Sequence, residues 1–148
     1  MIVATTIALA VLAGAQAPRV QDAILGVRVG SIASEVQATL GPRGTADSRP
    51  TRERGAKQVW TLNGTPFSSL AVKTDAAGRV VWVTGLVRQG EEIPFKEFGD
   101  LARASTASES RAVWDVPTAD GGYRLIVRGS GGRAQTVSLL SFDRETEK

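Results

Sequence analysis

The stretch QVWTLNGTPFSSLAVKTDAAGRVVWVTGLV, residues 58–87, decides the fold that we expect. Apolar residues alternate with polar ones in three runs, at 58–62, 68–73 and 79–87, which is the period of two typical of β-strands. The Asp-Ala-Ala-Gly segment at 75–78 indicates a hairpin turn, because glycine adopts positive φ without steric cost. The stretch therefore predicts a three-stranded antiparallel meander.

The same pattern returns 54 residues later in the chain. Trp114 and the Gly-Arg pair at 132–133 repeat Trp60 and the Gly-Arg pair at 78–79, and strands are expected at 111–116, 123–128 and 134–142. The glycine-rich segment at 129–133 is followed by a strand pattern and not by a helix, so it is a hairpin turn and not a phosphate-binding loop. A repeat at a fixed spacing indicates one structural unit used twice.

A short helix is expected before each meander. The first carries an apolar stripe of residues four apart, begins after Ser31 as N-cap and ends at the Gly-Pro pair 41–42. The second is expected at 94–104, with Pro94 at its first position. The first stripe consists of Ile32, Val36 and Leu40, and the second of Phe95, Phe98, Leu101 and Ala102.

We therefore predict an α+β fold of two tandem units, each a short helix followed by a three-stranded antiparallel meander. The units are residues 16–89 and 90–148, after a leader at 1–15. A strand at 25–29 opens the first unit, and the arginine-rich segment 43–57 is expected to be a loop. Trp60 and Trp114 occupy the same place in each unit and are expected in the core.

The N-terminal segment reads as a secretory signal peptide. An apolar run ends in small residues, which favours cleavage after Ala15, with a second fitting site after Ala17. The run has no preceding Lys or Arg, so an uncleaved weak anchor is the alternative, although about a dozen apolar residues are too few for a spanning helix. We expect a periplasmic or secreted protein without a stable membrane anchor.

Composition excludes much chemistry. The 148 residues include no Cys and no His, which removes the commonest metal ligand and general base and any disulfide. We expect no catalytic residues, no metal and no cofactor, and we keep a hydrolase with sequence-distant carboxylates as a third-ranked reading. The net charge of +3 would suggest nucleic acid as a partner if the chain were cytosolic. Because we expect the chain to be exported, nucleic acid is not an expected partner.

The first unit resembles the SmpA/OmlA outer-membrane assembly lipoprotein family. The resemblance covers residues 25–87 and depends on Val29-Gly30, Val36, the Leu-Gly-Pro segment at 40–42, Trp60 and Gly78. Pro42 directly follows Gly41, where the family usually has one residue between, and the lipoprotein cysteine is missing. Two units in tandem look more like the β-lactamase inhibitory proteins, so the resemblance implies a non-enzymatic protein that grips a partner on an open sheet face.

The alternation of the strands selects the residues of that face. If the Leu and Val residues of both meanders are buried, the opposite face carries Trp82 among cations and hydroxyls, a composition typical of interface hot spots. The competing interpretation is that Trp82 is covered by the other unit. The predicted binding residues are Lys73, Trp82, Thr84, Arg124 and Arg128, with Thr136 and Ser138 beside them.

We predict a non-catalytic protein-binding module that acts in envelope assembly or as an inhibitor. Its partner is expected to be another protein of the envelope or secreted fraction, with the segment 43–57 adding electrostatic steering. The alternative is a binder of an envelope polysaccharide or polyanion that uses Trp82 and the same cations. Charge-driven binding falls steeply with ionic strength, and a packed aromatic interface does not.

Overall fold

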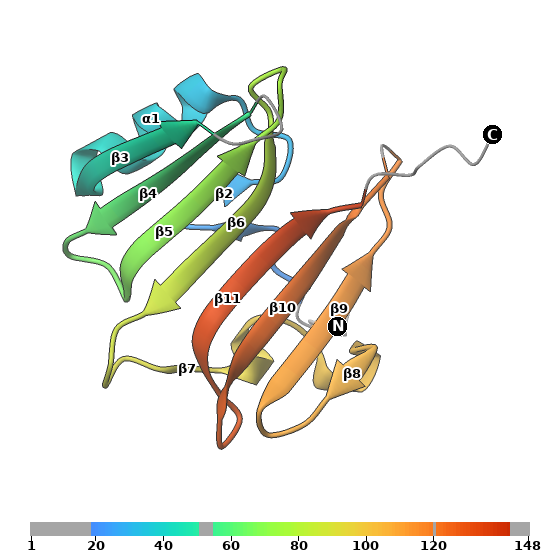
Figure 1. The fold of residues 1–148 in the computed structure, drawn as a ribbon. Coiled ribbons are helices and arrows are strands. Elements are labelled where there is room, and N and C mark those ends of the chain that lie inside the picture. Colours follow the sequence, from blue (N-terminus) through green and yellow to red (C-terminus); the bar gives the residue numbers. More distant parts are fainter. Residues whose placement is uncertain (1–18, 51–54, 120, 143–148) are drawn as a thin grey trace, which may run out of the picture.

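A single antiparallel sheet dominates the structure (Figure 1). The computed structural model describes residues 19–50, 55–119 and 121–142, with the side chains of Arg49 and Pro50 excepted. Eight of the nine strands lie in the order β3-β4-β5-β6-β11-β10-β9-β8, and β7 pairs with β11. The strands are β3 (Gly44–Pro50), β4 (Ala56–Leu62), β5 (Phe67–Thr74), β6 (Val80–Val87), β7 (Ile93–Pro94), β8 (Thr106–Ala107), β9 (Arg111–Val116), β10 (Tyr123–Ser130) and β11 (Arg133–Ser141).

The two meanders join into one sheet through β6 and β11. Thr84 lies directly opposite Ser138, which is its counterpart 54 residues later, and their hydroxyl oxygens are 2.7 Å apart. A pair of equivalent residues facing each other across antiparallel strands defines a local two-fold axis through the sheet. The strands predicted at 58–62, 68–73, 79–87, 111–116, 123–128 and 134–142 are confirmed to within two residues at their ends.

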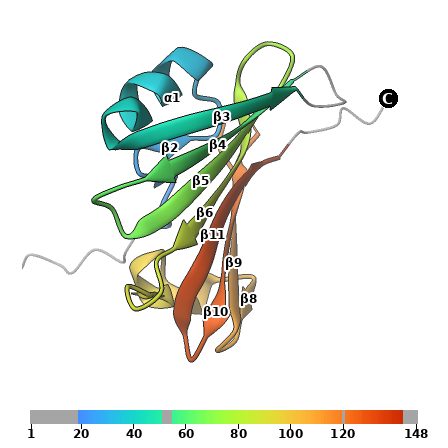
Figure 2. The same ribbon diagram turned by 60° about the vertical axis from the view of Figure 1, so that its left-hand side comes forward.

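The core lies on one face of the sheet. Trp60 and Trp114 are each 1% exposed, as predicted, and Leu70, Val83 and Val137 are fully buried beside them. This face is covered by helix α1 (Ala33–Leu40), by the hairpin of β1 (Ala23–Ile24) and β2 (Val27–Arg28), and by the segment 93–104 (Figure 2). The hairpin replaces the single strand predicted at 25–29, because Leu25 and Gly26 turn the chain with φ of 50° and 82°.

Helix α1 differs from the prediction only at its ends. Its N-cap is Ile32 and not Ser31, since the Glu35 carboxylate accepts a hydrogen bond from the Ile32 N–H at 3.2 Å. The Ser31 hydroxyl instead accepts a hydrogen bond from the Arg28 N–H. Beyond Leu40, the chain continues as a 3₁₀ turn, η1 (Gly41–Arg43), before β3 begins.

The predicted second helix is wrong, and with it the α+β class of two helix-plus-meander units. Segment 94–104 forms two 3₁₀ turns, η2 (Phe95–Glu97) and η3 (Leu101–Arg103), separated at Gly99. The Trp114 indole lies under Gly99, where an added Cβ would be 3.0 Å from the ring. The described fold is therefore mostly sheet, with α1 as its one α-helix in the described residues.

The segment predicted as a polar loop at 43–57 is also corrected. Residues 44–50 form the edge strand β3, paired with β4 from Gly44 opposite Leu62 to Pro50 opposite Ala56. Lys57 belongs to β4. Residues 51–54 lie outside the described residues, as do the leader at 1–15 and the charged tail at 143–148.

Candidate binding face

The side of the sheet opposite the core carries no helix in the described residues (Figures 1 and 2). Side chains that alternate with the core point to this side. We call it the open face and define it by three rows of residues that the strand register aligns across β4, β5, β6, β11, β10 and β9. The rows are Lys57–Lys73–Trp82–Leu140–Arg124–Asp115, Val59–Ala71–Thr84–Ser138–Ile126–Val113 and Thr61–Ser69–Leu86–Thr136–Arg128–Arg111.

Trp82 lies at the centre of the first row. Its cross-strand neighbours are Lys73 on β5 and Leu140 on β11, so the aromatic ring lies where the two meanders join. The side chain is half-buried, and Lys57 Nζ lies 5.7 Å from the centroid of its ring. A cation at this distance from an indole face is attracted by the negative potential of the ring. The residue remains partly exposed, with Leu140 of the second meander as its neighbour on one side.

The other end of the first row is an ion pair. Arg124 Nε donates to Asp115 Oδ1 at 2.6 Å, and Arg124 Nη2 donates to Asp115 Oδ2 at 3.3 Å. The hydrogen bond to Asp115 raises the pKa of the Arg124 guanidinium, so the group stays charged. The same guanidinium lies 5.3 Å from the ring centroid of Phe142. These contacts hold Arg124 in place and neutralise its charge locally.

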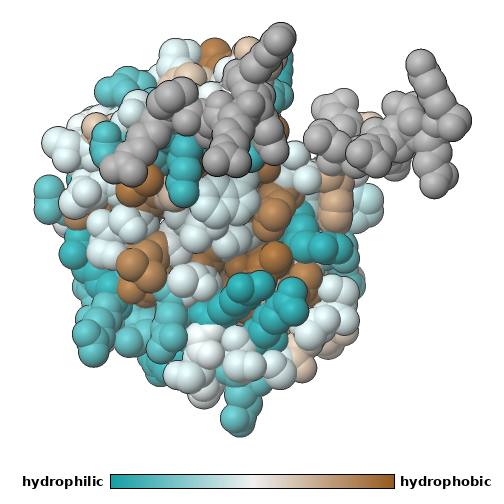
Figure 3. Space-filling model, in the orientation of Figure 1, coloured by the Kyte–Doolittle hydropathy of each residue, from teal (hydrophilic) through white to brown (hydrophobic). Residues whose placement is uncertain are grey.

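Apolar side chains remain exposed on the other two rows. Leu86 is 48% exposed and Val59 is 40% exposed, although most large apolar side chains of the described residues are buried. The space-filling view shows hydrophobic residues gathered over the centre of this face, with hydrophilic residues around and between them (Figure 3). An apolar centre with a polar margin is the usual composition of a protein-binding surface.

All five predicted binding residues lie on the open face. Lys73, Trp82 and Arg124 share the first row, whereas Thr84 and Arg128 lie in the second and third rows. Thr136 and Ser138 lie there too, directly opposite Leu86 and Thr84. The prediction missed Arg111, Val59 and Leu86. Alternation about Trp114, Trp60 and Gly85 would have placed these three on the same face.

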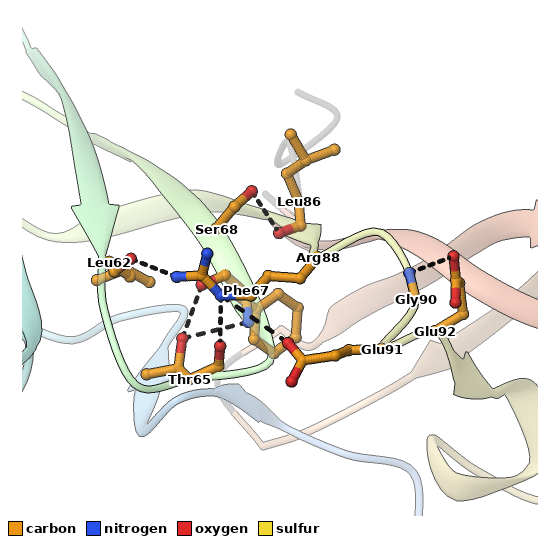
Figure 4. Close-up of polar contacts among 9 residues, drawn as sticks. All are labelled: Leu62, Thr65, Phe67, Ser68, Leu86, Arg88, Gly90, Glu91 and Glu92. Carbon is orange, nitrogen blue, oxygen red and sulfur yellow. Dashed lines mark hydrogen bonds and ion pairs between the residues drawn. The ribbon is translucent and has the colours of Figure 1, made fainter.

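A hollow of about 640 Å³ opens beside Leu86, at the end of strand β6. The cation that lines this hollow is Arg88, and its guanidinium already has partners within the protein. It donates to the backbone carbonyls of Leu62 and Thr65 and lies 3.9 Å from the Glu91 carboxylate (Figure 4). Arg88 therefore fixes the turn between β4 and β5 to the end of β6. The hollow is lined by Ser68, Leu86, Val87, Arg88, Gln89, Glu92 and Gln135.

The described part of the chain was compared with the patterns of a metal site and of a membrane-spanning helix. The residues at 19–50, 55–119 and 121–142 contain no cluster of three or more potential metal ligands. Within the same ranges, no helix has the length and apolar character needed to cross a bilayer. Comparison with known proteins finds no family model, curated protein or solved structure that matches the chain, so the resemblance to the SmpA/OmlA family stays a prediction.

Proposed function

We propose that this chain is a non-catalytic binding module whose open face docks a partner protein. The observation that carries the proposal is the half-buried Trp82 at the centre of a sheet face that no helix of the described residues covers, with the exposed Leu86 and Val59 in the neighbouring rows. Trp and Arg dominate binding energy at protein interfaces, and they do so near the centre of the contact. The open face places one Trp centrally and three arginines on one side.

The size of the face fits this role. Six strands about 4.8 Å apart and rows about 7 Å apart give a surface of about 25 Å by 15 Å. Long side chains at the margin extend it further. An ordinary protein interface buries about 800 Å² on each partner. The open face is large enough to supply the central part of such a contact.

The proposed setting is the periplasm or the extracellular space, where the chain acts in envelope assembly or as an inhibitor. The support is the leader-like segment at 1–15, which lies outside the described residues. Neither role needs a reaction centre, and both need a rigid surface. A sheet whose core contains two tryptophans that are each 1% exposed provides one.

An envelope polysaccharide or polyanion is the second candidate ligand. The stacking of Lys57 on Trp82 favours it, because an indole plane beside a cation can hold a sugar ring and its acidic group. The two candidates differ in their response to salt. Binding by Coulomb attraction weakens as the Debye length falls from about 10 Å at 0.1 M to about 3 Å at 1 M salt, whereas apolar packing persists.

The test is capture of partners from native envelope and secreted extracts by residues 16–148, washed at 0.1 M and 1 M salt. We expect the wild type to capture a protein in stoichiometric amount that stays bound at 1 M salt. We expect Trp82→Ala to bind that protein about 30-fold more weakly, as for a hot-spot residue. Leu101→Ala is the matched control, because Leu101 is 39% exposed in η3, away from the open face. Equal capture by Trp82→Ala would refute the proposal. Recovery of polyanions alone, lost at high salt, would favour the second candidate.

A further inference from the structure

Two arginines lie directly opposite each other on the open face. Arg111 of β9 pairs with Arg128 of β10 in the strand register. The Gly129 N–H donates to the Ser110 carbonyl at 3.0 Å, and the Arg111 carbonyl accepts instead from the Ser108 N–H, on the side away from β10. Arg111 and Arg128 are therefore a non-hydrogen-bonded pair, the class in which the Cα atoms approach to about 4.5 Å and the side chains are closest.

Like charges at such positions destabilise a sheet unless something compensates them. Four residues along the same strands, and on the same face, Asp115 pairs with Arg124, where a carboxylate meets a guanidinium in two hydrogen bonds. Arg111 and Arg128 are both exposed, and neither guanidinium forms an ion pair or hydrogen bond with any of the described residues. Within the described residues, nothing compensates the repulsion between these two cations.

The local two-fold axis supplies a comparison within the same sheet. The counterpart of the arginine pair in the first meander is Lys57 opposite Lys73, again two cations face to face. There, Lys57 Nζ lies over the ring of Trp82. The position equivalent to Trp82 in the second meander is Thr136, which lies beside Arg128 and offers no aromatic face. The arginine pair lacks the contact that its counterpart has.

We propose that Arg111 and Arg128 together seat a carboxylate of the partner protein, an Asp or Glu side chain, on the open face. This inference rests on the proposed function and names the chemistry of the partner. Each guanidinium presents planar N–H donors that match a carboxylate, and two of them can satisfy both of its oxygens. A bound carboxylate also screens the repulsion between the two arginines. Binding therefore relieves an unfavourable electrostatic energy that is present in the free protein.

The surroundings favour an acidic residue of a protein over a charged polymer. The third row continues from Arg128 through Thr136 to the exposed Leu86, so the anion seat adjoins an apolar site. The other arginine of β10 on this face, Arg124, is already neutralised by Asp115. A polymer with a charge on every unit needs a continuous run of free cations, whereas one uncompensated pair beside an aliphatic side chain fits an acidic residue flanked by apolar residues.

The first test needs no partner. The Nε–H NMR signals of the arginines are followed while sodium acetate or sodium sulfate replaces sodium chloride at constant ionic strength. We expect acetate to move the Arg111 and Arg128 signals together and with saturation, and not the signal of Arg103, an exposed arginine in η3. Movement with sulfate alone would reassign the seat to a sulfated or phosphorylated polymer. Equal movement of Arg103 would refute the site.

The second test compares Arg128→Gln with Lys96→Gln, which removes the same charge from an exposed position in η2. We expect Arg128→Gln to unfold at the same or a higher temperature than wild type, because the repulsion is gone, and to bind the protein captured by wild type at least tenfold more weakly. Capture of a protein by wild type with unchanged affinity in Arg128→Gln would refute the inference and leave the proposed function standing. Failure to capture any protein would refute the function, while the NMR result decides the anion seat separately.

Discussion

Replacing Trp60 with Phe will destabilise this protein less than replacing Trp114 with Phe, although the two side chains occupy equivalent positions and are equally buried at 1% exposure. The difference lies in the indole N–H groups. Trp114 Nε1 donates to the Asp100 carbonyl at 2.8 Å. Trp60 Nε1 is buried and has no hydrogen-bond partner among the described residues. Phenylalanine therefore removes a satisfied donor at one site and an unsatisfied donor at the other.

The magnitude follows from these two environments. Both substitutions remove similar ring volume from the core, a shared cost on the order of 1–2 kcal/mol. Trp114→Phe also loses a hydrogen bond worth about 0.5–1.5 kcal/mol net, whereas Trp60→Phe relieves a buried unsatisfied donor worth about 1–3 kcal/mol. We expect Trp114→Phe to be less stable than Trp60→Phe by about 1.5–4.5 kcal/mol, and Trp60→Phe to be close to wild type.

The assay is urea unfolding at pH 7, followed by far-ultraviolet circular dichroism so that the change in tryptophan content does not affect the signal. The comparison is valid if all variants share one m-value. Trp82→Phe, at a half-buried position on the open face, is the control and should change the unfolding free energy by less than about 0.5 kcal/mol. Equal destabilisation by Trp60→Phe and Trp114→Phe would refute the reasoning, since it would mean that the Trp60 N–H is hydrogen-bonded in solution.

Three further substitutions test the sheet. Thr84→Val removes the hydroxyl that meets Ser138 at the join and should cost about 1 kcal/mol in urea unfolding, whereas Thr84→Ser should be nearly neutral. Gly85→Ala would place a Cβ 2.6 Å from the Phe67 ring and should cost about 1–3 kcal/mol, part of which Phe67→Leu should restore. Burial raises the pKa of Tyr123, so its neutral form is favoured in the folded state. Stability should therefore be complete below the unfolded pKa of about 10 and fall as pH rises through the higher folded pKa, less steeply in Tyr123→Phe, which urea series at pH 8 and 10.5 will measure.

The meanders could be predicted because their signals are local. The alternation of apolar residues that predicts a strand, and the glycines that predict a turn, each lie within about ten consecutive residues. The turn glycines Gly78, Gly131 and Gly132 do adopt positive φ. Edge strand β3 gives no such signal. Ala46 and Ser48 point to the core side of the sheet but lie exposed at its margin, so no apolar alternation marks the strand. Its polar sequence is typical of an edge, where hydrophobic strands invite aggregation.

The missing second helix has a different cause. Phe95 and Phe98 are three residues apart, and this spacing suits a 3₁₀ turn as well as an α-helix. The Phe98 N–H bonds to the Phe95 carbonyl, which closes such a turn. Gly99 then packs against Trp114, and the Asp100 carboxylate accepts from the Ala102 N–H to start a new turn. A glycine followed by Asp inside the apolar stripe was the available signal against one continuous helix.

Alternation assigned the five predicted binding residues to one face, but it could not supply their neighbours. Strand register between β6 and β11 is a long-range property, fixed when the two meanders join, and no short window of sequence contains it. The proximity of Trp82 and Leu140 therefore emerged only from the structure. The pairing of Arg111 with Arg128 is easier to predict from the sequence, since β9 and β10 are consecutive strands of one hairpin. Arg111 is the first residue of β9, so little alternation precedes it to assign its side chain to a face.

The symmetry of the sheet and the asymmetry of its side chains together determine how a partner can dock. Equivalent strands meet at the join, so each meander places a pair of cations at the same register, Lys57 with Lys73 and Arg111 with Arg128. Only the first pair has an aromatic ring beside it, because Thr136 stands where the symmetry would require a second Trp82. A partner with one apolar contact and one acidic residue can therefore satisfy the face in one orientation and not in the orientation related by the two-fold axis. Exchanging the two roles, with Thr136→Trp and Trp82→Thr in one chain, should weaken binding of the captured protein even though the composition of the face is unchanged.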